Sequence, residues 1–182
     1  EDAHKVMRRL TRLLRPYRRQ IVLAALLLVA QTACLLAGPA LEVAPRLLGA
    51  TISHAGVSVR LTEVEAYCGA DDPGSHAFRG RTPRNEAMFG PPAHLYVYFT
   101  YGMHHCVNVV VGEVDSGSAV LLRGGVPIEG EAAMRANRGL AAGALPASIA
   151  GGPARLCQAL GIDRKLDAAT LWRGELRLLG GD

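Results

Sequence analysis

Acidic, aromatic and histidine side chains are concentrated in one stretch of this 182-residue chain, between residues 63 and 123. Glu63, Glu65 and Tyr67 alternate along a segment with strand-like spacing, which places their side chains on one face. A carboxylate beside aromatic rings in a partly dry cleft can act as a general base on water. Because both acids share that face, the spacing does not choose between Glu63 and Glu65. A solvated strand acid is the alternative interpretation of either one.

A second group of candidates is aromatic. Tyr96 and Tyr98 lie two residues apart in a β-branched and aromatic segment, and Tyr101 falls where a Tyr-Gly pair ends it. One face of such a strand could line a pocket for a flat ring, and its tip could act as a wedge. The alternative is an aromatic stripe buried in the core. His76 lies in a polar loop nine positions after Tyr67, where it either donates to a substrate or caps local backbone.

The loop around His76 is also basic. Arg79, Arg81 and Arg84 surround Gly80 in the run 79–85. Guanidinium groups and glycine backbone are suited to phosphate contacts, and a solvated charged loop is the alternative. The net charge of +4 permits a polyanionic partner without requiring one.

The elements that must position these groups follow from periodicity and from glycine and proline signals. We predict strands in 57–67, 95–101, 107–111 and 118–123, helices in 41–49, 129–137 and 153–160, and loops in 69–84 and 139–152. The loop 139–152 is predicted to be poorly ordered. Strands followed by helices, without regular alternation, predict an α+β fold.

The first forty residues differ from the rest. Seven basic residues crowd positions 5–19, and an apolar run from Ile21 to Ala37 follows. That run has about the minimum length of a membrane-spanning helix, with a basic flank typical of the cytoplasmic side. A signal peptide and an apolar helix packed on the domain are the alternatives. We therefore predict an appended N-terminal segment, residues 1–40, ahead of a domain at 41–182.

The four cysteines, Cys34, Cys68, Cys106 and Cys157, are far apart in the sequence and include no Cys-x-x-Cys pair. Their spacing does not suggest a zinc site, and buried free thiols in a reducing compartment are the simpler interpretation.

Several motifs in order carry a family resemblance. They are Val64–Tyr67, Ser75–Ala77, Arg79–Asn85, Met88–Pro92, Leu95–Met103, Cys106–Asn108 and Val120–Arg123, with flanking matches at Arg46–Gly49 and Gly152–Ile162. Residues 41–167 resemble the alkyladenine (3-methyladenine) DNA glycosylase family. Residues 12–24 loosely resemble the entry to the first transmembrane helix of ABC exporters, although the nucleotide-binding loop of a transporter does not occur in the chain.

The resemblance implies a fold and an activity. The fold is a single domain with a curved antiparallel sheet flanked by short helices, here C-terminally truncated because the family continues beyond the position of Asp182. The activity is excision of alkylated or deaminated purines, flipped out of duplex DNA, by a monofunctional glycosylase. The partner is damaged double-stranded DNA in the cytoplasm, at the nucleoid, and the protein is a monomer. The alternatives are a membrane-anchored, transporter-derived fragment and a lesion-binding relic without excision activity.

The resemblance also implies roles for individual residues. Glu65 matches the general base, and Arg123 matches a residue near the water and the phosphate. The pocket for the base corresponds to Tyr67, His76, Tyr98 and Asn108, and the DNA contacts to Tyr101, Met103, Arg79, Arg81 and Arg84. The only lysines, Lys5 and Lys165, lie outside the central stretch, so water rather than an amine is the expected nucleophile. No metal or organic cofactor is implied.

Overall fold

The computed structural model describes residues 15–36, 38–141, 143–171 and 177–179 of the chain. The chain divides into two compact units, Glu1–Gln31 and Thr32–Asp182. The first unit contains the short 3-10 helix η1 (Arg15–Tyr17) and most of helix α2 (Arg18–Leu36). Within the described residues, no helix combines the length and the apolar character needed to cross a membrane.

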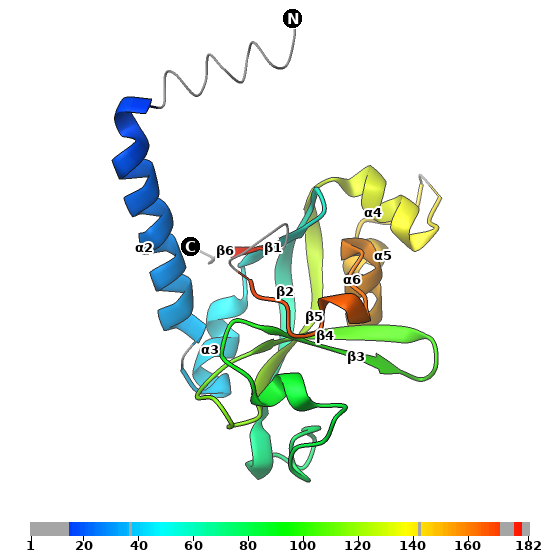
Figure 1. Cartoon of the computed structure of the whole chain (residues 1–182). Helices are drawn as coiled ribbons and strands as arrows, with labels where there is room; N and C mark the ends of the chain where they lie inside the picture. Colours follow the sequence, from blue (N-terminus) through cyan, green and yellow to red (C-terminus); the bar gives the residue numbers. More distant parts are fainter. Residues whose placement is uncertain (1–14, 37, 142, 172–176, 180–182) are drawn as a thin grey trace, which may run out of the picture. The chain divides into compact units, whose positions relative to one another are not determined.

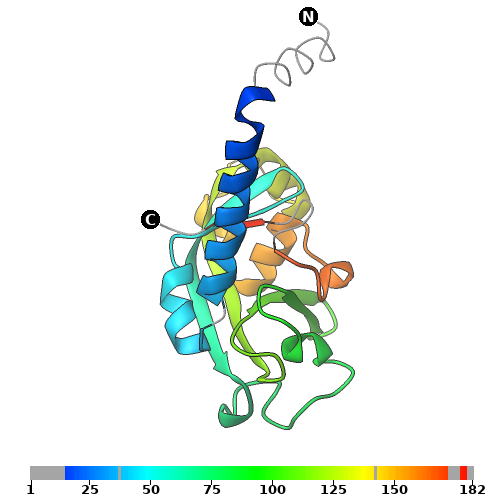
Figure 2. The same ribbon diagram turned by 60° about the vertical axis from the view of Figure 1, so that its left-hand side comes forward.

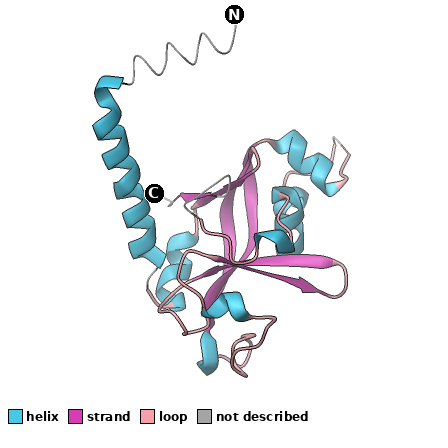
Figure 3. Cartoon of the chain, in the orientation of Figure 1, coloured by secondary structure: helices cyan, strands magenta, loops and turns pink. Residues whose placement is uncertain are grey.

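The second unit is built on a curled antiparallel sheet with the strand order β3-β4-β5-β2-β1-β6 (Figures 1 and 3). The strands are β1 (Thr51–His54), β2 (Val57–Cys68), β3 (Leu95–Thr100), β4 (His104–Val110), β5 (Ser118–Glu129) and β6 (Arg177–Leu179). The helices are α3 (Ala40–Leu47), α4 (Glu131–Arg138), α5 (Ala147–Ala150) and α6 (Pro153–Leu160), with 3-10 turns η2 (Gly69–Asp71), η3 (Glu86–Phe89) and η4 (Arg164–Leu166). The predicted α+β class with an antiparallel sheet and short helices is confirmed.

Two predicted elements agree closely with the structure because their ends carry strong local signals. Helix α6 begins at Pro153 and ends at Leu160, and its C-cap residue Gly161 adopts a left-handed conformation with φ +66°. Strand β3 ends at Thr100, and Tyr101 begins the following turn.

Two predictions, one strand end and one loop, are wrong. Strand β5 does not end at Arg123 but continues to Glu129, because β2 pairs with it as far as Ser58. The segment predicted as a poorly ordered loop at 139–152 contains helix α5, whose Ile149 is fully buried in the core. In both places tertiary pairing or packing overrides the weak local preference of glycine- and alanine-rich sequence.

The sheet has two different faces. One face carries the main hydrophobic core, to which β3 contributes Leu95 and Val97 and β4 contributes Val107 and Val109. Helices α3 to α6 supply the other side of this core, and α4, α5 and α6 lie together beside the sheet (Figure 1). The opposite face carries a smaller cluster around Tyr96, which the loop between β2 and β3 covers. Alternation along each strand thus separates structural from candidate functional side chains.

Strands β2 and β5 lie side by side in the sheet (Figure 2), and two adjacent β-bulges in them reverse this alternation partway along. Leu61 pairs with Gly125 and Glu63 with Gly124, so Thr62 is an extra residue in β2. Val64 then pairs with Leu122, so Arg123 is an extra residue in β5. Before the bulge Val57, Val59 and Leu61 face the core, and after it Val64, Ala66 and Cys68 do. Bulges of this kind bend a strand and re-aim its side chains.

Candidate functional site

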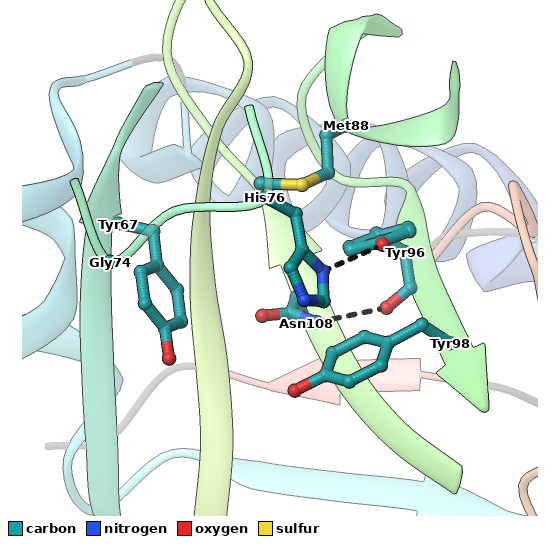
Figure 4. A pocket seen from close by; sticks show the side chains of 7 residues that line it. All are labelled: Tyr67, Gly74, His76, Met88, Tyr96, Tyr98 and Asn108. Carbon is teal, nitrogen blue, oxygen red and sulfur yellow. Dashed lines mark hydrogen bonds between the residues drawn. The ribbon is translucent and has the colours of Figure 1, made fainter. Parts of the chain in front are cut away.

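A pocket opens on the face of the sheet opposite the main core (Figure 4). Its volume is about 220 Å³, including the part open to solvent. Four elements supply its walls: β2, β3, β4 and the loop between β2 and β3. The lining residues are Tyr67, Gly74, His76, Met88, Tyr96, Tyr98 and Asn108. Of these, the sequence predicted Tyr67, His76, Tyr98 and Asn108 as site residues, and all four are brought together.

The aromatic wall of the pocket is formed by three rings. Tyr96 and Tyr98 stack with ring centroids 5.4 Å apart and planes at 28°. His76 stands edge-on to Tyr98, with centroids 4.6 Å apart, and its Nδ1 lies 2.9 Å from the Tyr96 hydroxyl. Tyr96 is almost fully buried. The interpretation of this strand as only a core stripe is therefore incomplete, since the rings both pack and line a cavity.

Asn108 forms part of the buried end of the pocket. Its side chain is 1% exposed, and Nδ2 donates to the Tyr96 carbonyl oxygen over 3.1 Å. The register of β3 and β4 sets Asn108 directly opposite Tyr96. A buried amide with a fixed donor direction is a suitable group for discriminating between polar edges of a ligand.

Beside the pocket lies a charged cluster of Glu63, Glu65, Tyr67 and Arg123. The Tyr67 hydroxyl donates to Glu65 Oε1 over 2.8 Å. Arg123 donates through Nη1 to Glu65 Oε2 over 2.5 Å and through Nε to Glu63 Oε1 over 2.8 Å. The bulge at Arg123 brings this side chain to the face shared by both acids. Glu65 is linked to the pocket through Tyr67, whereas the Glu63 carboxylate hydrogen-bonds only Arg123 within the described residues.

Burial and neighbouring charge shift the acidity of the pocket side chains. Burial, reinforced by the hydrogen bond to Glu65, raises the pKa of Tyr67 to about 12. Burial likewise raises the pKa of Tyr96 to about 12 and raises the pKa of Tyr98. The pKa of His76 is lowered, first by its packing against the tyrosines and second by the positive charge of Arg84. Near neutral pH the pocket therefore presents uncharged phenols and an uncharged imidazole.

Asn85 fixes the loop that carries His76, a role that the sequence did not indicate. It is 2% exposed. Its Nδ2 donates to the carbonyl oxygens of His76 and Gly80 over 2.8 and 3.0 Å, and its Oδ1 accepts from the Thr82 backbone amide over 2.6 Å. Met88 and Gly74 were also missed as pocket residues. Tyr96 was a candidate from strand alternation with Tyr98, although the family resemblance gave it no role.

The basic residues of the loop have different environments. Arg81 bonds Glu86 over 3.1 Å, pairs with Asp115 and lies over the Phe89 ring. Arg84 donates to the Phe99 carbonyl oxygen over 3.4 Å and influences His76. Arg79 is exposed and makes no hydrogen bond or ion pair among the described residues. The Arg81 guanidinium is thus occupied by partners within the chain. Arg79 and Arg84 are better placed to contact an anion outside the protein.

The hairpin between β3 and β4 projects two large side chains. Tyr101 is 86% exposed and Met103 is 66% exposed. Tyr101 and Gly102 have φ of +54° and +67°, and the Met103 amide donates to the Thr100 carbonyl oxygen over 3.2 Å. Positive φ at both central residues is the geometry of a type I′ turn. A tight turn between the paired Thr100 and His104 therefore presents a tyrosine to solvent at the end of the strand that carries the pocket tyrosines.

The described residues contain no group of three or more His, Cys, Asp or Glu side chains that could hold a metal ion. Cys68, Cys106 and Cys157 are free thiols, and burial raises the pKa of Cys106 and Cys157. The side chain of Cys34 lies outside the described residues.

Comparison with known proteins places these features in a family. The family model for methylpurine-DNA glycosylase matches residues 34–181. Curated relatives bear the name "Putative 3-methyladenine DNA glycosylase". One from Cutibacterium acnes is 57% identical over 126 residues, which cover 69% of this chain and 64% of that protein. One from Frankia casuarinae is 53% identical over 137 residues, covering 73% of this chain and 61% of that protein.

A third relative with the same name, from Streptomyces avermitilis, is 53% identical over 152 residues, covering 80% of this chain and 70% of that protein. The chain thus spans roughly two thirds of the length of these relatives. The matched region includes the whole described pocket and the charged cluster beside it. The chain therefore belongs to the methylpurine-DNA glycosylase family.

Proposed function

We propose that this chain is a monofunctional DNA glycosylase of base-excision repair. Its substrates are alkylated or deaminated purines in duplex DNA, the class that includes 3-methyladenine, 7-methylguanine, hypoxanthine and ethenoadenine. The reaction is hydrolysis of the N-glycosidic bond of a nucleotide flipped out of the helix. Family membership supports the reaction class, and the names of the relatives support methylated adenine as one substrate.

The observation that supports the proposal most is the position of Glu65. Its carboxylate is bound by Tyr67, which lines the aromatic pocket, and by Arg123, which comes from the neighbouring strand. A purine held in the pocket would bring its sugar to the pocket mouth, on the side of this carboxylate. A carboxylate there can both accept a proton from water and stabilise a cationic sugar.

The proposed step breaks the bond between C1′ and the purine nitrogen, and its electron pair leaves with the base. A water oxygen bonds to C1′ as positive charge develops on the sugar, and Glu65 takes the proton that this water loses. Arg123 holds Glu65 in place. Glu63 accepts from the same guanidinium but makes no hydrogen bond to a pocket residue among the described residues, which favours Glu65 as the general base.

Recognition of the base falls to the pocket walls. Tyr67 and Tyr98 offer faces for stacking, and purines that carry positive charge after alkylation bind well to electron-rich rings. His76, neutral near pH 7, offers a hydrogen bond to the base edge. Asn108 lies at the buried end, where its amide would reject the exocyclic amine of normal guanine.

Duplex binding falls to the exposed groups around the pocket. Tyr101 fills the gap left by the flipped nucleotide, and Met103 flanks it. Arg79 and Arg84 contact phosphates. Arg81 matches the family motif, but its pairing with Glu86 and Asp115 favours a role in holding the loop.

An excision assay tests the proposal. The full chain is incubated with an end-labelled duplex that contains one ethenoadenine or one hypoxanthine, and the abasic product is cleaved with hot alkali. We expect a single break at the lesion. Glu65→Gln is expected to reduce excision by about 100-fold or more while lesion binding persists. Glu63→Gln is the matched control, because it alters the same face and the same arginine, and it should retain most activity.

Two results would contradict the proposal. A folded chain that binds the lesion without any break would be a lesion-binding protein instead of a glycosylase. A Glu65→Gln variant with the excision rate of the parent would remove Glu65 from the mechanism.

A further inference from the structure

The two stacked tyrosines of the pocket lie on an edge strand. Strand β3 ends the sheet, and among the described strands it pairs with β4 alone. The backbone groups of Leu95 and Val97 point away from β4 and would be unpaired in an exposed edge. Edge groups of this kind leave a strand free to shift or to pair with another chain.

Residues 164–171, here called the edge segment, run along the outer side of β3. The Leu95 amide donates to the Ala169 carbonyl oxygen and the Ala168 amide donates to the Leu95 carbonyl oxygen, both over 2.8 Å. The Leu171 amide donates to the Ala93 carbonyl oxygen over 3.0 Å. These are backbone contacts, as a neighbouring strand would make.

At Val97 the pattern changes from backbone to side chains. The Val97 amide donates to Asp167 Oδ1 over 2.8 Å, and Arg164 Nη1 donates to the Val97 carbonyl oxygen. Arg164 and Asp167 also pair with each other over 3.3 Å. Asp167 retains 20% side-chain exposure, and Val97 is fully buried. One ion pair therefore replaces both partners that a next strand would provide.

The location of Val97 gives this ion pair a link to the site. The Val97 amide belongs to the peptide unit that joins Tyr96 to Val97, and the Val97 carbonyl belongs to the unit that joins Val97 to Tyr98. Asp167 and Arg164 thus bind the two peptide units between the stacked tyrosines. Tyr96 also contacts His76 through its hydroxyl. A rotation of either unit would change the spacing of the rings that form the pocket wall.

We propose that Arg164 and Asp167 are positioning residues for base recognition, which they support by fixing the backbone between Tyr96 and Tyr98. This inference rests on the proposed glycosylase function. Hydrogen bonds to charged groups are stronger and more directional than neutral ones, which suits a clamp on a single residue. Loss of the carboxylate leaves the buried Val97 amide without a partner, so the strand has a reason to shift.

The test compares three variants of the full chain. Asp167→Ala removes the acceptor for the Val97 amide. Asp167→Asn keeps an oxygen at that place and should restore the contact. Asp163→Ala is the matched control, since Asp163 Oδ1 accepts from the Lys165 amide in the same region and makes no hydrogen bond to β3 among the described residues. Each variant is checked for folding by circular dichroism.

The first readout is single-turnover excision of ethenoadenine from a duplex, measured over a range of protein concentrations. Asp167→Ala is expected to lower the maximal excision rate about tenfold, because a small misplacement of binding groups slows the reaction. The protein concentration at half-maximal rate should change little, since the duplex contacts lie elsewhere. Asp167→Asn should recover most of the rate, and Asp163→Ala should match the parent.

The second readout is independent of catalysis. In NMR spectra Asp167→Ala should accelerate hydrogen exchange of the Val97 amide and move the ring signals of Tyr96 and Tyr98, while Asp163→Ala should do neither. If Asp167→Ala does not fold, Arg164→Ala carries the same measurements through loss of the Val97 carbonyl contact.

The outcomes separate the two proposals. If the parent excises no lesion, the glycosylase proposal fails, and the ring signals alone decide whether the ion pair positions the tyrosines. Unchanged ring signals in Asp167→Ala, or an excision rate equal to that of the parent, would overturn the positioning role. An equal loss of rate in Asp163→Ala would also overturn it, because any disturbance of the segment would then suffice.

Discussion

His76 packs against other rings of the pocket but stays accessible to solvent. Its ring packs against Tyr98 and bonds Tyr96, yet the residue as a whole is exposed to solvent. Packing and the Arg84 charge both disfavour the protonated ring and lower its pKa from 6.5. The ring is therefore neutral at physiological pH, which leaves it one donor and one acceptor.

Removal of the Arg84 charge should raise the pKa of His76. Arg84→Gln eliminates the second cause of the shift but not the first, so the pKa should rise and stay below 6.5. An NMR titration of the His76 ring measures it, with Arg79→Gln as a control from the same loop. No rise, or an equal rise in both variants, would contradict the assignment.

The same shift predicts how stability depends on pH. The folded protein binds this proton less tightly than the unfolded chain does, so protonation favours unfolding. The contribution of His76 to stability is thus complete above pH 6.5 and is lost as the pH falls below 6.5.

The charged cluster shows what the sequence could and could not predict at this scale. The spacing correctly put Glu63 and Glu65 on one face. It could not separate their roles, because the difference lies in contacts with Tyr67 and Arg123 that span strands. Asn85 gave no signal, since a single asparagine in a polar loop does not reveal the carbonyl oxygens that it bonds.

Among the elements, the β3–β4 hairpin holds a large exposed side chain in an unfavourable backbone conformation. Tyr101 is a non-glycine residue in the left-handed region, with 86% of its surface exposed. That conformation costs an ordinary residue about 1–2 kcal/mol, and burial does not compensate for it here. Strained, exposed aromatic residues are more readily explained by binding than by folding.

Replacement of Tyr101 by asparagine should separate the two effects. Tyr101→Asn creates an Asn-Gly pair, which is favoured in type I′ turns, and should raise the free energy of unfolding by about 1 kcal/mol. Affinity for a lesion duplex should fall because the inserted ring is lost. Chemical denaturation and duplex titration measure the two quantities. Met103→Asn serves as a comparison that removes an apolar side chain without relief of φ, and a similar stability gain in it would argue against the strain.

Elements with local signals were predictable, and elements set by pairing were not. Pro153 and Gly161 delimit α6 within the sequence itself. The continuation of β5 past Arg123 depends on β2, and the bulge at Thr62 depends on a partner sixty residues away. Strict alternation from Val57 would have put Glu63 and Glu65 on the face of Val59 and Leu61, inside the core. Only the extra residue at Thr62 brings them to the pocket face.

At the scale of the whole molecule, one face of the sheet packs against the helices of the core, and the other face is covered by the loop that forms part of the site. Gly117, directly before β5, lies close against the loop between β2 and β3. A Cβ at Gly117 would lie 2.7 Å from Ala77 Cβ and 2.9 Å from the Phe89 ring, with φ at +65°. Ala77 is adjacent to His76, so the packing of this layer bears directly on the pocket.

Gly117→Ala should weaken both the fold and the site. We expect its free energy of unfolding to fall by about 2 kcal/mol more than that of Gly139→Ala. Gly139 has a similar φ of +61° but no atom within 4 Å of a Cβ, so it isolates the cost of the clash. Excision should fall with Gly117→Ala and persist with Gly139→Ala. Equal losses of stability would mean that the loop yields without strain.

The two bulges shift the pairing of β2 and β5 in opposite directions. Thr62 moves the pairing of β2 and β5 by one residue, and Arg123 moves it back, so pairs on both sides keep the same register. Because each is an extra residue, a deletion of Thr62 would leave Leu61 followed directly by Glu63, and Glu65 and Tyr67 would keep their face. A deletion of Arg123 would likewise keep the faces of β5, but it would remove the arginine that binds Glu65. The two extra residues therefore turn the later side chains of both strands to the other face without a change of pairing register, and the second one also supplies a side chain of the site.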